Sequence, residues 1–147
     1  MEFPISGQAL VRLIPQKPPF VFVDTLIAVT SKSCTTIFTP LPHNPLVQNG
    51  KLSLAGLLEH MAQSAGCKTG FDNFNQGKKP GVAFIGEVRE MCVYRLPELN
   101  TKIHTTIEVE HLVFGAVVVV HAEAKSGNEI LASCKLKVFF ETEESDR

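Results

Sequence analysis

The stretch NGKLSLAGLLEHMAQSAGCKTGF, residues 49–71, is the only long segment of this chain with a clear helical period. Its apolar residues recur at intervals of three and four, which places them on one side of a helix. These residues are Leu54, Leu57, Leu58, Met61, Ala62 and Ala65. Asn49 or Ser53 can cap the start of this helix, and Gly70 can end it. The segment therefore predicts one long helix around which the rest of the chain is organised.

Two polar residues, Glu59 and Gln63, flank this apolar stripe. Glu59 and Gln63 lie four positions apart and therefore on the same helical face. A carboxylate and an amide on the flank of a helix that we expect to be buried need a reason, which on spacing alone is either a function or a contact with water or a lysine. His60 points about 100° further around the helix than Glu59, so we expect it at the surface or at an interface. The later residues of the helix are small enough for another backbone to approach closely: Ala62, Ser64, Ala65 and Gly66.

The composition predicts a single globular domain, residues 1–147. A chain of this length buries roughly two thirds of the surface that it exposes when unfolded, and 44% of its residues are hydrophobic. The formal net charge of −1 gives no indication of nucleic-acid binding. The longest apolar run, residues 116–120, is too short to span a membrane. Four scattered cysteines without a CxxC pair argue against a zinc site or a disulfide scaffold, so we expect a reducing, cytoplasmic location.

The segments outside the long helix alternate between turn signals and runs typical of strands. Ser6 is a candidate cap for a short helix in residues 7–15, and residues 41–50 and 72–81 have the Pro, Asn and Gly content of loops. Strands are predicted from β-branched and aromatic content at residues 20–29, 34–40, 82–96, 102–114, 116–125 and 129–141. Turns are predicted at Gly115 and at residues 126–128.

This order of elements predicts an α+β fold in which one long central helix is wrapped by a curved antiparallel sheet. Residues 103–109 alternate clearly, so one face of their strand should be buried; that face carries Ile103, Thr105, Ile107 and Val109. Such a sheet leaves unpaired edge strands, and pairing two protomers edge to edge is one way to remove them.

Three segments, in this order, resemble the hot-dog fold and, within it, the 3-hydroxyacyl-[acyl carrier protein] dehydratases. LIPQKPPFVFVDTL (residues 13–26) is similar to the opening segment of that family. GLLEHMAQSAG (residues 56–66) is similar to its central helix, whose Glu-x-Met-Ala-Gln core is Glu59 to Gln63 here. AFIGEVREMCVYRLP (residues 83–97) is similar to the strand that follows.

The chain departs from the family pattern in three places. The glycine usual five residues before the glutamate is Leu54 here. The chain has Pro45 where the family's loop carries a histidine, so that the nearest candidate is His43, 16 positions before Glu59. It also has Gln16 where many relatives have a histidine that is not their base. With these departures the chain looks like a divergent branch, associated with aryl-polyene and flexirubin-type pigment synthesis, in which a hot-dog subunit accompanies or pairs with a dehydratase.

The resemblance implies a hydro-lyase that removes water from 3-hydroxyacyl thioesters to give 2-enoyl thioesters in fatty-acid or polyene biosynthesis. His43 would take the proton from C2, and Glu59, in the sister subunit's half of the site, would help the 3-hydroxyl leave as water. Gln63 and Gly56 are supporting candidates, because an amide can orient Glu59 and backbone amides near the helix start can polarise the thioester carbonyl. No metal or organic cofactor is implied, since the phosphopantetheine of an acyl carrier protein carries the substrate.

Further residues are candidates for contacts with the acyl chain and with the carrier protein. Phe84, Phe114 and Val82 are candidates for an acyl tunnel, although aromatic residues of strands more often belong to a core. An acidic carrier protein would meet basic residues, which otherwise serve solubility: Lys78, Lys79, Arg89 and Arg95. The resemblance implies a homodimer, or a heterodimer with another hot-dog subunit.

Two alternatives remain open at this point. The chain is a non-catalytic partner that supports an active dehydratase subunit, or it is an acyl thioesterase, since the same fold hosts thioester hydrolysis with a helix carboxylate that activates water.

Overall fold

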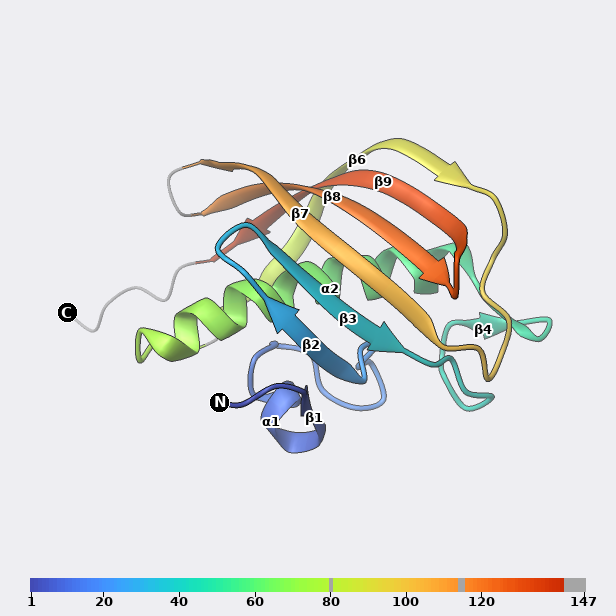
Figure 1. Ribbon diagram of the computed structural model, residues 1–147, viewed down its shortest axis with the longest axis horizontal. Helices are drawn as coiled ribbons and strands as arrows, with labels where there is room; N and C mark the ends of the chain where they lie inside the picture. Colours follow the sequence, from blue (N-terminus) through green and yellow to red (C-terminus); the bar gives the residue numbers. More distant parts are fainter. Residues whose placement is uncertain (80, 114–115, 142–147) are drawn as a thin grey trace.

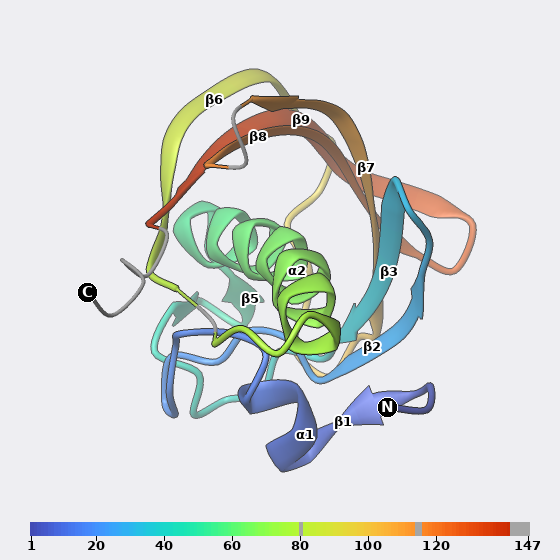
Figure 2. The same cartoon turned by 90° about the vertical axis from the view of Figure 1, so that its left-hand side faces the viewer.

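The computed structural model describes residues 1–79, 81–113 and 116–141, and it has the α+β architecture that the sequence predicts. The elements in chain order are β1 (Ile5–Ser6), α1 (Gly7–Val11), β2 (Thr25–Val29), β3 (Ser33–Phe38), β4 (Val47–Gln48), β5 (Lys51–Leu52), α2 (Leu54–Asn75), β6 (Ala83–Val93), β7 (Ile103–Val113), β8 (Val117–Ser126) and β9 (Glu129–Phe140). Seven strands form one antiparallel sheet in the order β1-β2-β3-β7-β8-β9-β6, and β4 pairs with β5. The sheet curves around α2, as Figure 1 and Figure 2 show.

The helix α2 begins where the sequence predicts, with Ser53 as its N-cap. The Ser53 hydroxyl accepts a hydrogen bond from the Gly56 N–H at 3.1 Å. The prediction that Gly70 ends the helix is wrong, because α2 continues to Asn75. A side chain at Gly70 would overlap the carbonyl group of Leu13, so glycine here permits a close contact with the N-terminal part of the chain.

Nearly the whole circumference of α2 is buried, rather than one stripe. Leu57 and Met61 pack into the core as predicted, whereas Leu54 is 46% exposed at the first turn. Each large apolar side chain buried in this way stabilises the fold by about 1.5–3 kcal/mol. Polar residues of α2 are buried as well, namely His60, Gln63, Ser64 and Lys68. These polar groups need hydrogen-bond partners, and several partners lie far away in sequence.

One set of partners comes from residues 13–22, here called the crossing segment, which runs along the side of α2 that the sheet leaves open (Figure 2). Leu13 meets Gly70 at one end, and Phe22 bonds to side chains of α2 at the other. The predicted strand at residues 20–29 is therefore only partly right, since β2 covers Thr25–Val29. The backbone of Phe22 bonds to helix side chains instead of to a neighbouring strand.

The second half of the chain follows the prediction closely. Strands β6 to β9 are antiparallel neighbours, and Ile103, Thr105 and Ile107 are buried on one face of β7. The turn at residues 126–128 joins β8 to β9, with Gly127 at a φ of +58°. The predicted turn at Gly115 lies outside the described residues.

Smaller corrections concern the N-terminal half. The predicted loop at residues 41–50 contains β4, and the predicted loop at 72–81 begins with the last turn of α2. Ser6 occupies the N-cap position of α1, but its side chain makes no capping hydrogen bond. Within the described residues, no helix is long and apolar enough to cross a membrane.

Candidate functional site

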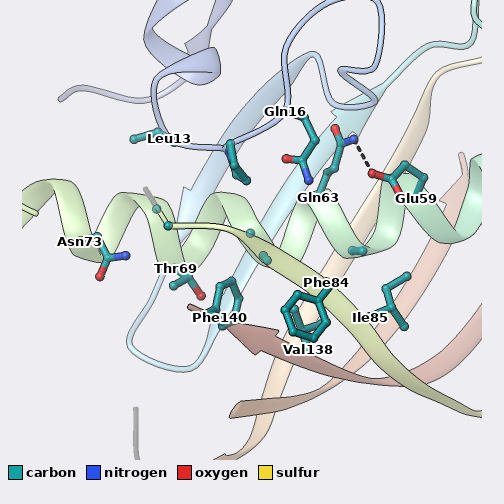
Figure 3. Close-up of a pocket in the computed structure, with 16 residues that line it drawn as sticks. Leu13, Gln16, Glu59, Gln63, Thr69, Asn73, Phe84, Ile85, Val138 and Phe140 are labelled. Carbon is teal, nitrogen blue, oxygen red and sulfur yellow. Dashed lines mark hydrogen bonds between the residues drawn. The ribbon is translucent and has the colours of Figure 1, made fainter. Parts of the chain in front are cut away.

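A pocket lies between α2, the crossing segment and the edge of the sheet at β6 and β9 (Figure 3). Its cavity volume is about 50 Å³. The lining residues are Leu13, Pro15, Gln16, Glu59, Ala62, Gln63, Gly66, Thr69, Gly70, Asn73, Gly81, Ala83, Phe84, Ile85, Val138 and Phe140. The pocket thus follows one face of α2, faces apolar side chains of β6 and β9, and contains the Glu59–Gln63 pair.

Gln63 fixes the position of the Glu59 carboxylate. The side chain of Gln63 is buried and donates through Nε2 to Glu59 Oε1 and to the carbonyl oxygen of Phe20, both at 2.9 Å. Its Oε1 accepts the Phe22 N–H at 2.7 Å. A backbone N–H can only donate, so the Gln63 carbonyl must face Phe22 and its NH₂ group must face Glu59. Gln63 therefore both orients Glu59, as the sequence suggested, and ties the crossing segment to α2.

The Glu59 carboxylate keeps one oxygen free for chemistry. Oε1 is held by Gln63, whereas Oε2 accepts no hydrogen bond from the residues that the structure describes. Glu59 is half-buried and lines the pocket. A carboxyl group that is held by one oxygen and open at the other can transfer a proton to a ligand at a defined position.

His60 is buried, so the prediction of a surface or interface position is wrong. Its Nδ1 lies 2.7 Å from the Phe22 carbonyl oxygen and its Nε2 lies 2.7 Å from Thr105 Oγ1. Because a carbonyl can only accept, Nδ1 carries the hydrogen and Nε2 accepts from the Thr105 hydroxyl. The ring stacks on Phe38 at 5.2 Å between centroids, and burial lowers the pKa of His60 to about 4. His60 is a neutral structural residue that does not line the pocket.

His43 lies in a different depression from Glu59. It is exposed and lines a shallow surface hollow with Pro18, Asp24 and Phe38 among its neighbours. Local turns hold this loop, since the Asn44 N–H bonds to the Leu41 carbonyl at 3.0 Å. Within one chain, therefore, the two residues predicted as acid and base are not brought together in one pocket.

The candidates for the acyl tunnel are placed differently from one another. Phe84 lines the pocket and stacks on Phe139 at 5.7 Å between ring centroids. Val82 is 55% exposed and is not among the lining residues. Phe114 lies outside the described residues. The sequence did not single out Ile85 and Phe140, which complete the apolar wall, because strand residues facing a pocket and facing a core have the same pattern.

The basic candidates for carrier-protein contact occupy separate places. Lys78 and Lys79 are exposed in the loop after α2, close in the chain to the pocket residues Asn73 and Gly81. Arg89 bonds to Glu87 at 2.5 Å. Arg95 pairs with Glu129 at 2.7 Å, and both side chains are exposed.

Gly56 packs tightly but its amide is already engaged. An added side chain there would overlap Leu52, and its N–H donates to Ser53. Gly56 therefore serves the packing and the capping of the start of α2.

Gln16 lines the pocket, although its position in the opening segment of the family did not predict a role in the site. Its Oε1 is buried and is without a hydrogen-bond partner among the described residues. An unsatisfied buried acceptor costs about 1–3 kcal/mol. The signal in the sequence was only the polar side chain between Pro15 and Lys17.

The described parts of the chain hold neither a metal cluster nor, at Cys34 and Cys134, a reactive thiol. No group of three His, Cys, Asp or Glu residues there is arranged to hold a metal ion. Burial raises the pKa of the Cys34 thiol to about 12 and that of Cys134 to about 11, so both remain protonated.

Comparisons with known proteins show which family the chain belongs to. A model of the ApeP-like family, described as ApeP dehydratase, matches residues 8–146. No match was found among curated proteins. Among solved structures, the dehydratase heterocomplex ApeI:P from Xenorhabdus doucetiae is similar, with a TM-score of 0.85 and 15% identity over 97% of this chain and 94% of that chain.

Two further solved structures are similar at lower scores. The PaaI protein from the phenylacetic acid degradation operon of E. coli has a TM-score of 0.60 and 12% identity over 78% of this chain and 80% of that chain. A hypothetical thioesterase with coenzyme A from Streptococcus pneumoniae TIGR4 has a TM-score of 0.60 and 10% identity over 82% of this chain and 87% of that chain. These structural likenesses establish the hot-dog fold.

Proposed function

This chain belongs to the ApeP-like family of dehydratases, and from that premise we propose that it acts on 3-hydroxyacyl chains carried by an acyl carrier protein. The observation that carries the proposal is the Glu59 carboxylate, held by Gln63 at one oxygen and open at the other, in a pocket with an apolar wall. The reaction is the loss of water to give a 2-enoyl thioester. Glu59 is its acid.

In the proposed elimination, every proton and electron pair has a defined origin and destination. A base takes the C2 proton, the electrons of that C–H bond form the C2–C3 double bond, and the C3–O bond breaks. Glu59 in its acid form gives its proton to the departing hydroxyl, which leaves as water, and the carboxylate remains. Gln63 holds the carboxyl group in place during the step.

The base is supplied from a second hot-dog subunit in this proposal. None of the described residues that line the pocket is a histidine, and His43 of the same chain faces another hollow. Strand β6 ends the sheet and also forms one wall of the pocket. Pairing of a second sheet along β6 would bring residues of the other subunit to the pocket. His43 would then serve in the neighbouring half of a homodimer, or the other subunit of a heterodimer would supply its own base.

Two observations favour such a partner. The edge strand β6 exposes apolar side chains, among them Phe84 and Val88. An unpaired edge of this kind is a template for pairing with another chain. The similar structure from Xenorhabdus doucetiae is named as a heterocomplex, which supports a hot-dog subunit as the partner here.

The test is turnover of a 3-hydroxyacyl carrier protein, followed by mass spectrometry as the loss of one water from the acyl chain. The chain is assayed alone and together with a catalytic hot-dog subunit from the same source. Glu59→Gln keeps an acceptor for Gln63 but has no acidic proton, so we expect turnover to fall by about 10²-fold or more. Glu108→Gln on the outer face of β7 is the matched control and should leave the rate unchanged.

The outcomes separate the possibilities. Turnover by the chain alone that His43→Ala abolishes identifies a homodimer with His43 as the base. Turnover only with the second subunit identifies a partner, which is catalytic if Glu59→Gln slows the complex. Undiminished turnover with Glu59→Gln in the complex leaves the chain as a non-catalytic partner and refutes Glu59 as the acid.

Hydrolysis of an acyl thioester is a second candidate, because a hypothetical thioesterase with coenzyme A has the same fold. A pocket carboxylate can activate water for attack on a thioester. A colorimetric assay for free thiol separates this reaction from dehydration, which leaves the thioester intact.

For carrier-protein docking we favour Lys78 and Lys79 over the two arginines. Both lysines follow α2 near the Asn73 end of the pocket, whereas Arg89 and Arg95 are each paired with a glutamate. The double variant Lys78→Glu with Lys79→Glu should raise KM for a carrier-bound substrate and leave KM for a small pantetheine thioester unchanged. An equal effect on both substrates would contradict docking at this loop.

A further inference from the structure

A continuous chain of hydrogen bonds runs from the core of the fold to Glu59. It begins at the Thr105 hydroxyl on β7 and the His60 ring, whose Nε2 lies 2.7 Å from Thr105 Oγ1. The other ring nitrogen, Nδ1, donates to the Phe22 carbonyl oxygen at 2.7 Å. The N–H of the same Phe22 donates to Gln63 Oε1 at 2.7 Å. Gln63 Nε2 then donates to Glu59 Oε1 at 2.9 Å (Figure 3).

The backbone of Phe22 depends on side chains of α2, because it lies before β2 begins at Thr25. Its carbonyl group bonds to His60 and its N–H bonds to Gln63, and its side chain is fully buried. Without His60 the carbonyl oxygen would be a buried acceptor with no partner, at a cost of about 1–3 kcal/mol. This part of the crossing segment would then move to reach another donor or water, and the Phe22 N–H would move with it.

The crossing segment in turn decides which way the Gln63 amide faces. Its Oε1 accepts the Phe22 N–H, and its Nε2 donates to the Phe20 carbonyl oxygen at 2.9 Å as well as to Glu59. A flip of the amide would place its oxygen against the Phe20 carbonyl and its NH₂ group against the Phe22 N–H, so both contacts would become repulsive. The observed orientation therefore requires that both backbone groups stay in place.

The orientation of Gln63 decides which oxygen of Glu59 carries the acidic proton. In a protonated carboxyl group, the carbonyl oxygen is a better acceptor than the hydroxyl oxygen. Because the N–H of Gln63 points at Oε1, it favours the acid with its proton on Oε2, the oxygen that no described residue holds. A flipped amide would offer its oxygen to Glu59 instead. The proton would then be drawn to Oε1 and bonded to Gln63, where it could not reach a ligand.

We propose that His60 is a positioning residue that keeps the acidic proton of Glu59 on Oε2. It acts through Phe22 and Gln63, and it lies outside the pocket itself. From Oε2 the proton passes to the departing hydroxyl of the substrate. This inference rests on the proposed dehydratase function, because it concerns the delivery of the proton in that reaction.

Ser64, one turn after His60, supplies a matched control. Both side chains are fully buried, and each bonds to a threonine of the sheet, His60 to Thr105 and Ser64 to Thr36 at 2.8 Å. The two threonines are register partners on the adjacent strands β7 and β3. The Ser64 hydroxyl bonds to Thr36 and to the His60 carbonyl and does not reach the crossing segment. Ser64→Ala therefore removes a buried polar contact of the same kind without touching the chain that leads to Glu59.

The experiment compares His60→Leu, which loses both ring bonds, with Ser64→Ala. His60→Gln is the rescue variant, because it keeps a donor for Phe22 and an acceptor for Thr105. The first measurement is hydrogen exchange of the Gln63 side-chain NH₂ group by NMR, with Gln63→Leu to assign the signal. Exchange should be about tenfold faster in His60→Leu and little changed in Ser64→Ala and His60→Gln.

The second measurement is turnover of a 3-hydroxyacyl carrier protein, in the oligomeric form that is active and at a temperature at which every variant is folded. His60→Leu should lower kcat by about tenfold and leave KM within about twofold, since only the delivery of the proton is affected. His60→Gln should restore most of the rate, and Ser64→Ala should retain it. If His60→Leu does not fold, Thr105→Val replaces it under the same criteria, because it removes one ring bond and keeps the shape of its side chain.

The outcomes separate this inference from the proposed function. Faster Gln63 exchange and a lower kcat in His60→Leu, with both near wild type in Ser64→Ala, support the positioning role. Unchanged exchange, free exchange already in the wild type, or an unchanged kcat overturns it. Equal losses in His60→Leu and Ser64→Ala overturn it as well, because they reflect general destabilisation. If no form of the protein dehydrates the substrate, the proposed function fails, whereas faster exchange in His60→Leu alone still supports the positioning of Gln63 by His60.

Discussion

The buried His60 predicts how the stability of this protein depends on pH. Its ring is held in the neutral form between the Phe22 carbonyl and the Thr105 hydroxyl, and burial lowers its pKa from 6.5 to about 4. Between these two pH values the unfolded chain binds a proton at this residue more readily than the folded chain does. The stability that neutral His60 contributes is therefore fully present above pH 6.5 and is lost as the pH falls toward 4.

The size of the effect follows from the pKa difference. One pKa unit corresponds to about 1.4 kcal/mol, so lowering the pH from 6.5 to 4 should remove about 3 kcal/mol of unfolding free energy through His60 alone. This amount is a substantial part of the 5–15 kcal/mol typical of a folded domain. Carboxyl groups of the protein also contribute to the dependence of stability on pH. A comparison of the wild type with a variant at His60 removes this shared contribution.

The assay is urea unfolding at a series of pH values between 4 and 7 for the wild type and for His60→Gln. Glutamine offers one donor for Phe22 and one acceptor for Thr105 but does not titrate. The variant is expected to be less stable at neutral pH, because it packs differently against Phe38, yet its stability should fall less steeply with acid. Parallel pH profiles for the two proteins would refute the assignment of a neutral, desolvated His60.

Three further predictions concern packing, the Gln63 contacts and the thiols. Gly70→Ala should lower the free energy of unfolding by about 1–3 kcal/mol because the new methyl group meets the Leu13 carbonyl. Gly66→Ala, whose methyl group would make an ordinary contact with Ile14 at 3.9 Å, should raise it by up to about 1 kcal/mol, so equal urea midpoints for the two would contradict the packing described. Gln63→Leu should cost about 2–3 kcal/mol in urea unfolding because it leaves a backbone amide of the crossing segment unpaired, and a loss below about 0.5 kcal/mol would mean that this contact contributes little. A thiol reagent should modify Cys92 alone in the native protein and all four cysteines after unfolding, and rapid native labelling of a second thiol would contradict the burial of the other three.

The elements that local sequence patterns specify were predicted well. Alternation of apolar and polar residues located β7 and its buried face, and the Gly127 turn located the β8–β9 hairpin. The N-terminal start of α2 was predicted because Ser53 caps it through a bond within one turn. In each case the interactions that decide the structure join residues close together in the chain.

The positions that were predicted wrongly depend on partners far away in the chain. The sequence predicts a surface or interface position for His60 because it points away from Glu59, but the curved sheet also covers that side of α2 and offers Thr105, 45 residues away. The sequence predicts a helix end at Gly70, whereas the structure requires glycine there because Leu13 passes directly over it. A helix periodicity identifies which residues share a face, but it does not say how many faces the rest of the fold covers.

The site was predicted in part for the same reason. The spacing of Glu59 and Gln63 placed both on one face, and the structure adds the hydrogen bond between them. Gln16 could not be assigned from spacing, since it reaches the pocket only through the path of the crossing segment. Its carboxamide oxygen becomes conspicuous only when the hydrogen bonds around it are known.

The hydrogen-bond state of the polar residues along α2 distinguishes scaffold from site better than burial does. On the side of His60 and Ser64 the polar side chains are deeply buried and their bonds are complete, as in the 2.8 Å bond between Ser64 and Thr36. Groups with their bonding complete fix the fold and have nothing to offer a ligand. On the side of Glu59, one carboxylate oxygen is without a partner among the described residues, and Glu59 lines the pocket. The binding chemistry is therefore concentrated on the less buried side of the helix, next to the sheet edge at which a second subunit would complete it.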